Sequence, residues 1–387
     1  MKRHKVKMIA LPYITIVTFL FFQGHAANVK QLGKRPVKYC NYFILIVFFC
    51  FRGYVFTDVL SYQPYFYRVA TLNEIVGTHY LQHQWWEPGF IVYMSFFKTI
   101  CNNYFFYQFL DSLIDLIILY KCLEYFEINN SFSIMVFLAM NGMIMFFDLQ
   151  RNIKSILIFC YSLRYVQTGN WKKYYLFGLL CYFFHHSSIV YFICYPMLKM
   201  KITKRKFVYI CFASICFSII SSRILSLLVS LLSGFSLGRV AEMANAYITS
   251  TALSSFLSLG VLEKFLMMSL IILNFDKIFS NRKNSLALNC FSLYIIFYFS
   301  FFGVKVLSER LSILFVFSYW ILVPKIIEVQ KKVYKLIFSF FILTYCILKM
   351  SLYSQPQDWY ENWLFGEISS LGERKQIWRH FNGARGK

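Results

Sequence analysis

Residues 51–90, FRGYVFTDVLSYQPYFYRVATLNEIVGTHYLQHQWWEPGF, form the first long stretch of this chain that a lipid bilayer would not accept. Side chains that carry or can take a charge recur along it: Arg52, Asp58, Arg68, Glu74, His79, His83 and Glu87. The stretch is also rich in Tyr and Trp, which is unusual for an inert linker. The segments around it are apolar enough to lie in lipid. We therefore expect the chemistry of this protein in a polar loop held by membrane helices.

The composition of the whole chain is that of an integral membrane protein. The 387 residues are 58% hydrophobic and 15% charged, and the mean hydropathy is +0.53. Soluble domains carry charge on about a quarter of their residues, so this chain could not cover itself against water. Aromatic residues make up 21% of it, and Tyr and Trp suit the headgroup level of a bilayer. These values predict an all-α protein with many membrane spans.

Apolar runs separated by basic clusters predict about 11–12 transmembrane helices within residues 1–350. They lie near 40–56, 104–120, 131–148, 152–166, 174–185, 187–198, 207–222, 256–275, 285–303, 311–327 and 334–350, after an N-terminal run that is either a signal peptide or an uncleaved span. The Lys199–Lys206 cluster marks the cytoplasmic side, which places loops 53–87 and 223–255, and the active site, in the periplasm. The polar tail 351–387 is expected to lie on the headgroup plane or to be disordered.

The net charge of +23 does not indicate nucleic-acid binding, because Lys and Arg fall in short runs between apolar segments. Such runs are typical of the positive-inside rule and of attraction to anionic headgroups. The 11 Cys are scattered and include no Cys-x-x-Cys pair, which argues against a disulfide framework or a metal site. Motifs of nucleotide-driven enzymes, serine hydrolases and zinc proteases are absent from the sequence. We therefore expect neither a metal nor a cofactor.

Arginines recur on the expected outer face, where the positive-inside rule disfavours them: Arg52, Arg151, Arg223, Arg239 and Arg310. The guanidinium group keeps its charge and binds phosphate oxygens in a bidentate fork. An anionic ligand, most simply a lipid phosphate or pyrophosphate, would explain several of these arginines together. The alternative is that each side chain reaches the headgroups of ordinary phospholipid.

Four further positions carry groups suited to proton transfer or hydrogen bonding. His185, in the turn Phe-Phe-His-His-Ser-Ser, can take a proton from a hydroxyl near neutral pH, although a histidine hydrogen-bonded within the bundle is the alternative. Glu87, before Pro-Gly, suits a structural cap, a base or a sugar ligand. Asp111 and Asp115 lie four apart on one helix face, where hydrogen bonds between helices are expected.

Five short motifs follow one another on the expected outer face. They are R-x5-D-x3-Y (Arg52, Asp58, Tyr62), E-P-G-F (Glu87–Phe90), Q-R (Gln150–Arg151), F-H-x-S (Phe184, His185, Ser187) and E-R-L (Glu309–Leu311). In order and spacing they resemble the EpsG-like branch of the Wzy-type O-antigen and exopolysaccharide polymerases. The resemblance runs from about residue 40 to about residue 330, and it includes neither His186 nor the tail.

The resemblance implies a multi-pass polymerase of the bacterial inner membrane. Such a glycosyltransferase moves a growing glycan from undecaprenyl pyrophosphate to the next lipid-linked repeat unit on the periplasmic side. It would use Arg151, rather than a metal, on the leaving pyrophosphate, and His185 as the base or as the group that orients the acceptor. The donor and its sugars would be bound by the remaining motif residues: Arg52, Asp58, Tyr62, Glu87, Ser187 and Arg310. Trp85 and Trp86 are expected to stack on sugars or to anchor the loop. Membrane lipids and a chain-length regulator protein are the expected partners.

Two other functions remain open. A flippase for lipid-linked oligosaccharide would need charges along a central path and two-fold repetition, and the sequence shows no such repeat. A membrane acyltransferase acting on polysaccharide would also use a histidine, but on the cytoplasmic side, where its thioester donor is found.

Overall fold

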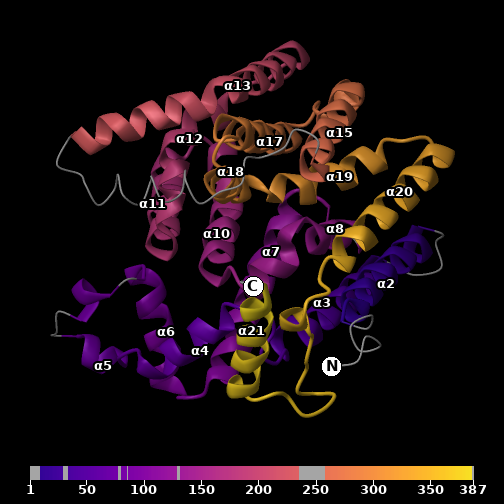
Figure 1. The fold of residues 1–387 in the computed structure, drawn as a ribbon. Helices are drawn as coiled ribbons and strands as arrows, with labels where there is room; N and C mark the ends of the chain where they lie inside the picture. Colours follow the sequence, from indigo (N-terminus) through magenta and orange to yellow (C-terminus); the bar gives the residue numbers. More distant parts are fainter. Residues whose placement is uncertain are drawn as a thin grey trace. The chain divides into compact units, whose positions relative to one another are not determined.

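The computed structural model describes residues 9–28, 34–76, 80–84, 86–128, 131–234 and 258–385. The regular structure of this part of the chain is helical, and β pairing is confined to an isolated antiparallel bridge between Arg52 and Asn362 (Figure 1). The prediction of an all-α fold is confirmed. The chain divides into two compact units. Unit 1 comprises residues 1–164, 171–189 and 330–387, and unit 2 comprises residues 165–170 and 190–329.

Unit 1 contains the polar stretch 51–90. Its elements are α2 (Leu11–Asn28), α3 (Lys34–Cys50), α4 (Val59–Arg68), α5 (Leu72–Ile75), η1 (Tyr80–His83), α6 (Pro88–Ile100), α7 (Tyr104–Tyr125), α8 (Ser131–Phe137), η2 (Leu138–Gly142), α9 (Met143–Phe147), α10 (Gln150–Gln167, its last residues in unit 2), α11 (Trp171–Phe184), η3 (His186–Ile189), α20 (Lys332–Ser351), η5 (Pro356–Asp358) and α21 (Leu371–Arg385). Helix α2 packs against α8 and α20, and α3 packs against α7.

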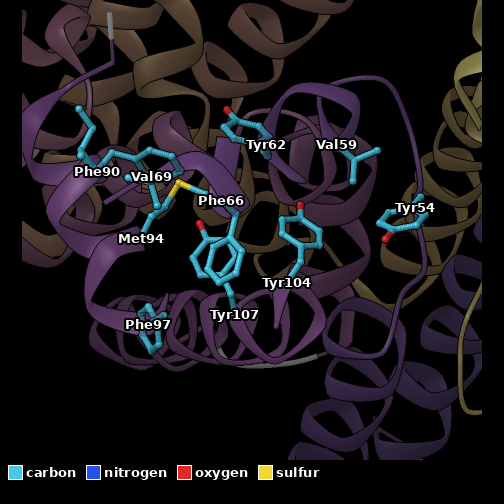
Figure 2. Packing of buried hydrophobic residues seen from close by; sticks show 11 residues of the cluster. Tyr54, Val59, Tyr62, Phe66, Val69, Phe90, Met94, Phe97, Tyr104 and Tyr107 are labelled. Carbon is cyan, nitrogen blue, oxygen red and sulfur yellow. The ribbon is translucent and has the colours of Figure 1, made fainter. Parts of the chain in front are cut away.

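The stretch 51–90 folds into helices because its aromatic side chains form a core of their own. Phe66 of α4 and Phe90 and Met94 of α6 are fully buried in a cluster that also contains Tyr107 of α7 (Figure 2). The rings of Phe66 and Tyr107 stack with their centroids 5.2 Å apart. Full burial of one large apolar side chain contributes about 2 kcal/mol. Several such residues therefore fix α4 and α6 beside α7.

Unit 1 also buries charged side chains. Nζ of Lys154, on α10, lies 2.5 Å from a carboxylate oxygen of Asp111 and 2.9 Å from one of Asp115, both on α7. None of the three side chains is more than 4% exposed. The predicted polar contact between helices is thus confirmed for both aspartates. It fixes the beginning of α10, where Arg151 lies nearly one turn before Lys154.

Unit 2 is organised around α17 (Arg282–Ser300). Its other elements are α12 (Val190–Lys199), α13 (Lys204–Gly234), α15 (Leu259–Leu273), α16 (Phe275–Ile278), α18 (Lys305–Ser312), η4 (Ile313–Phe315) and α19 (Phe317–Glu328). Helix α17 packs against α12, α13, α18 and α19, and it is buried from Leu286 to Ile295. Because α13 continues to Gly234, the first part of the expected loop 223–255 is helical. The rest of that loop, with Arg239, lies outside the described residues.

The predicted 11–12 membrane spans are not confirmed. Within the described residues, α20 is the one helix long and apolar enough to cross a membrane, and a second crossing results if Lys305–Phe315 and Phe317–Glu328, bent by 60°, count as one span. A span needs about 20 residues, whereas α11 has 14 and α12 has 10. The run 131–148 is interrupted by η2, a π-helical turn in which Asn141 has a φ of 67°.

The described part of the tail, 351–385, is folded rather than disordered. Residues 357–363 are hydrogen-bonded to residues 47–56, and α21 packs against α4 (Figure 1). The tail is therefore part of unit 1.

Candidate active site

Glu87 is the centre of the candidate active site. It occupies the N-cap of α6, and Pro88 takes the first helical position, where a fixed φ and a missing N–H are tolerated. The Glu87 side chain is only 5% exposed. A carboxylate that has lost its hydration needs partners that compensate for the loss. Arg151 and His185 are those partners.

The two carboxylate oxygens of Glu87 contact different side chains. Nη1 of Arg151 donates to Oε2 at 2.6 Å, and Nδ1 of His185 lies 3.0 Å from Oε1. Arg151 lies in the first turn of α10, and His185 directly follows α11. The backbone N–H of His186 adds a longer contact, 3.4 Å, to Oε1. One carboxylate therefore joins the start of α6, the start of α10 and the end of α11.

Gly89 explains how α6 comes so close to α11. A Cβ atom at this position would lie 2.7 Å from both the carbonyl oxygen and the Cβ of Phe183, and 2.9 Å from its carbonyl carbon. Contacts this short against backbone atoms force a displacement. Only glycine lets the first turn of α6 approach the last turn of α11, two residues before His185. The Pro-Gly pair after Glu87 is thus part of the geometry of the site.

The protonation of Glu87 sets the tautomer of His185. Burial alone would raise the pKa of Glu87, but the hydrogen bond with His185 and the charge of Arg151 outweigh it and lower the pKa from 4.5 to about 2. Glu87 is therefore a carboxylate near neutral pH, and a carboxylate only accepts hydrogen bonds. Nδ1 of His185 must carry the proton that it donates. In the neutral ring, Nε2 then holds the lone pair and can accept a proton.

Arg151 has a second set of neighbours on the other side of its guanidinium. The Cζ atom lies 5.2 Å from the centroid of the Trp86 ring, and the Tyr62 side chain interacts with the guanidinium. Tyr62 itself is buried in the aromatic core of α4. The Arg151 side chain is still 29% exposed. Arg151 is therefore held firmly on several sides and remains accessible to an anion from solvent.

Asp58 lies at the start of α4, the helix that carries Tyr62, and is its N-cap residue. Its backbone N–H and that of Thr57 donate to Oδ1 of Asp148, at 2.8 and 2.9 Å. Asp148 precedes α10 by two residues, so it ties the beginning of α4, which carries Tyr62, to the beginning of α10, which carries Arg151. Asp148 positions the site, and no local sequence pattern indicates a contact across 90 residues.

Arg52 is placed inside unit 1 rather than at its surface. Its residue is 2% exposed, and Nη1 donates to Phe49 O at 2.6 Å and to Oγ of Ser112 at 2.5 Å. The guanidinium also lies over the ring of Phe147, 5.4 Å from its centroid. These partners belong to the helix bundle, and the structure does not bring Arg52 to Glu87.

The other predicted ligands are distributed over both units. Ser187 is half-buried in η3, two residues after His185. Arg310 is an exposed residue of α18 in unit 2, and Arg223 is an exposed residue of α13. Trp85 lies outside the described residues. Within the described part of the chain, no group of three or more His, Cys, Asp or Glu side chains is arranged to hold a metal ion.

Fold and site together define a class of protein: an all-helical chain in which one buried carboxylate contacts both a histidine and a partly exposed arginine. A sequence profile of the EpsG family matches residues 37–364. The chain belongs to the EpsG family, and this membership indicates a polysaccharide polymerase type of function. The match extends beyond the predicted end near residue 330 and includes the first part of the tail. Comparisons with curated proteins and with solved structures find no match.

Proposed function

We propose that this protein polymerises a bacterial surface polysaccharide at the periplasmic face of the inner membrane. It transfers a growing glycan from undecaprenyl pyrophosphate to a hydroxyl group of the next lipid-linked repeat unit. The observation that supports this most directly is the contact of one buried carboxylate, Glu87, with both His185 and Arg151. Such a group combines a proton acceptor with a fixed cation, the two functions that this transfer needs.

The proposed reaction uses each of these residues once. Nε2 of His185 takes the proton of the acceptor hydroxyl while its oxygen attacks the anomeric carbon of the donor glycan. The new carbon–oxygen bond forms as the bond to pyrophosphate breaks, and the electron pair leaves with the pyrophosphate oxygen. Arg151 stabilises the charge that develops there. Glu87 keeps Nδ1 protonated and stabilises the imidazolium that results, as carboxylates do beside other catalytic histidines.

The residues around this group are suited to bind sugar. Trp86 flanks Arg151 and is only half-buried, so its ring can stack on a sugar, whereas Tyr62 is buried and interacts with the Arg151 guanidinium instead. We assign Asp58, at the start of α4, and Ser187, in the turn after His185, to the hydroxyl groups of the donor or acceptor. Arg310 remains a proposed phosphate ligand from unit 2, whereas the burial of Arg52 favours a role in holding the loop.

The exposed surface supports a membrane location. Large apolar side chains are more than half exposed on α13 and on α20: Tyr209, Phe212, Ile219, Val333, Tyr334, Ile337, Phe341 and Leu348. Water solvates such helix faces poorly, and extensive exposed apolar surface usually marks contact with lipid or a partner protein. We propose multiple crossings of the inner membrane, with several broken helices, and contacts with membrane lipids and a chain-length regulator protein.

The site favours group transfer over transport. A flippase needs no proton acceptor, whereas the Glu87–His185 contact leaves His185 with a basic nitrogen. An acyltransferase would also use such a histidine, so the product decides between the two. The test uses a strain that lacks its own polymerase and makes the matching repeat unit. Its surface polysaccharide is separated by gel electrophoresis, where chains of increasing length form a ladder of bands. The wild-type gene should restore the ladder, and Arg151→Ala, at equal membrane level, should leave a single repeat unit.

Arg151→Lys refines this test. Lysine keeps the charge but loses the planar fork that contacts both Glu87 and a phosphate, so we expect short chains in reduced amount. The proposal would be contradicted if the wild-type gene did not restore the ladder. It would also be contradicted if the strain that carries Arg151→Ala made the same ladder as the strain that carries the wild-type gene.

A further inference from the structure

The tail after α20 is bound along the segment that leads into the candidate site. Three backbone hydrogen bonds join them: Gly53 N–H to Glu361 O (2.8 Å), Trp363 N–H to Phe51 O (3.0 Å) and Phe56 N–H to Gln357 O (3.0 Å). Two side chains of the tail add hydrogen bonds: Asn362 Nδ2 to Val47 O (2.7 Å) and Tyr360 Oη to Phe48 O (2.8 Å). The segment from the end of α3 to the residues before α4 is therefore held by the tail.

A buried ion pair fixes the tail in this position. Nη2 of Arg374, on α21, lies 3.0 Å from Oε2 of Glu361 and donates to Trp359 O at 2.9 Å. The Arg374 side chain is 3% exposed and that of Glu361 is 13% exposed. Glu361 also accepts from the backbone N–H of Ser369 at 3.0 Å. Breaking a buried pair leaves an uncompensated charge, which costs far more than loss of a surface pair.

Gly53 shows how closely the loop and the tail fit. A Cβ at this position would lie 2.9 Å from Cγ2 of Ile368 and 3.0 Å from Cβ of Glu361. Real Cβ atoms make almost no contacts shorter than these, so a larger residue would push the tail away from the loop. The glycine that follows Arg52 is thus required by residues more than 300 positions later in the chain.

The tail reaches the candidate site through α4. Helix α21 packs against α4, and the two lie side by side in Figure 1. Helix α4 carries Tyr62, which interacts with Arg151. The loop held by the tail also leads directly into α4. Both the beginning and one side of α4 are therefore supported by residues 356–385.

We propose that residues 356–374, the C-terminal strap, position the candidate site, and that Glu361 and Arg374 are its positioning residues. This inference rests on the polymerase function proposed above. The strap holds α4 so that Tyr62 keeps the Arg151 guanidinium in line with Glu87. Arg374 lies beyond residue 364, where the match to the family ends, so its role comes from the structure of this chain alone.

The test compares two arginines of the same helix, Arg374→Met and Arg379→Met. Arg379 is exposed on α21 and serves as the matched control. Each variant is purified, placed in vesicles of inner-membrane lipid and supplied with the single lipid-linked repeat units that accumulate in the polymerase-deleted strain. We expect kcat per folded molecule to fall about tenfold or more in Arg374→Met, because small displacements of catalytic groups are costly. KM should change little, and Arg379→Met should behave as wild type.

Two further readouts separate positioning from general stability. Backbone amides of residues 51–62 should exchange hydrogen faster in Arg374→Met, and Arg374→Lys should recover part of kcat because it keeps the charge opposite Glu361. If Arg374→Met does not fold, Gly53→Ala tests the same contact from the loop side with the same expected changes. A wild-type kcat per folded molecule, or unchanged exchange in residues 51–62, overturns the inference.

Glu87→Gln in the same assay shows which proposal fails. If Glu87→Gln is inactive while Arg374→Met keeps full activity, the strap is not a positioning element and the proposed site stands. If Glu87→Gln keeps the wild-type rate, the proposed site itself is wrong, whatever the strap variants do.

Discussion

At the scale of single residues, Glu87 shows how one carboxylate can prepare two other groups for chemistry. Its contact with Arg151 fixes a cation at a partly exposed position, and its contact with His185 fixes the tautomer of a base. The pKa of Glu87, lowered to about 2, keeps the carboxylate charged while it does both. The same shift makes the folded state sensitive to acid.

Loss of the Glu87 charge should therefore lower stability in a pH-dependent way. The folded-state pKa is below the unfolded value of 4.5, so the stabilisation is complete above pH 4.5 and is lost as pH falls through 2. A shift of this size corresponds to about 3 kcal/mol. In detergent, the difference in free energy of unfolding between wild type and Glu87→Gln should shrink by about this amount from pH 5 to pH 2. A difference that stays constant over that range would contradict the account.

Gly89 provides a second test at the residue scale. Gly89→Ala places a methyl group 2.7 Å from Phe183 O, so α6 and α11 must separate and His185 must move away from Glu87. We expect polymerisation to fall by about 10–100-fold, the cost of displacing a catalytic group by up to 1 Å. The control is Gly260→Ala in α15, because a Cβ at Gly260 would meet only the flexible end of Lys264, 3.9 Å away. Equal activity of the two variants would show that the approach of α6 to α11 is not needed.

Arg52 shows what the sequence alone can and cannot predict about a residue. Its position at the end of an apolar run indicates a functional arginine, and so does its place in the motif shared with the EpsG-like polymerases. The sequence does not reveal that Ser112 and Phe49 O bind the guanidinium or that the distant tail covers the adjacent backbone. Burial depends on tertiary packing, so a buried structural arginine and an exposed phosphate ligand look alike in the sequence.

At the scale of elements, α10 carries two layers of charge. Arg151, in its first turn, faces Glu87, and Lys154, nearly one turn later, faces Asp111 and Asp115 of α7. The Lys154 contacts with the two aspartates are buried, so they determine how firmly the beginning of α10, and with it Arg151, is held. A change in these contacts should affect folding before it affects chemistry.

Lys154→Met would leave two carboxylates buried without their cation. Removing one partner of a buried pair typically costs about 3–5 kcal/mol, so we expect a lower melting temperature and less folded protein in the membrane. Neutralising the aspartates as well, in Lys154→Met/Asp111→Asn/Asp115→Asn, should restore much of the loss. Lys172→Met, on the exposed face of α11, is the control. A single variant as stable as wild type would contradict the structural role of the pair.

Helices were predictable where an apolar run is uninterrupted. The runs 104–120, 285–303 and 334–350 correspond to α7, α17 and α20. The run 131–148 contains a break at Asn141, where φ is 67°, and no apolar pattern in the sequence shows it. The count of spans differs from the prediction because some of these helices, such as α11 and α12, are short, and others, such as α7 and α17, are long enough but not apolar enough.

At the scale of the whole molecule, the contacts at Glu87 lie entirely within unit 1. They join residues 64 and 98 positions apart in sequence. The motifs that contain Glu87, Arg151 and His185 were recognisable, whereas their contact around a single carboxylate was not, because one sequence carries no information on which distant segments meet. The same holds for the C-terminal strap, whose contacts join residues more than 300 positions apart.

The most direct test of the central claim compares the two adjacent histidines by the polysaccharide ladder of the polymerase-deleted strain. His185 contacts Glu87 through its ring, whereas His186 is exposed and approaches Glu87 through its backbone N–H. At equal membrane levels, His185→Ala should lower polymerisation by about 10²–10⁴-fold, the usual contribution of a general base, and leave a single repeat unit. His186→Ala should give the wild-type ladder. A full ladder from His185→Ala would contradict the proposed mechanism.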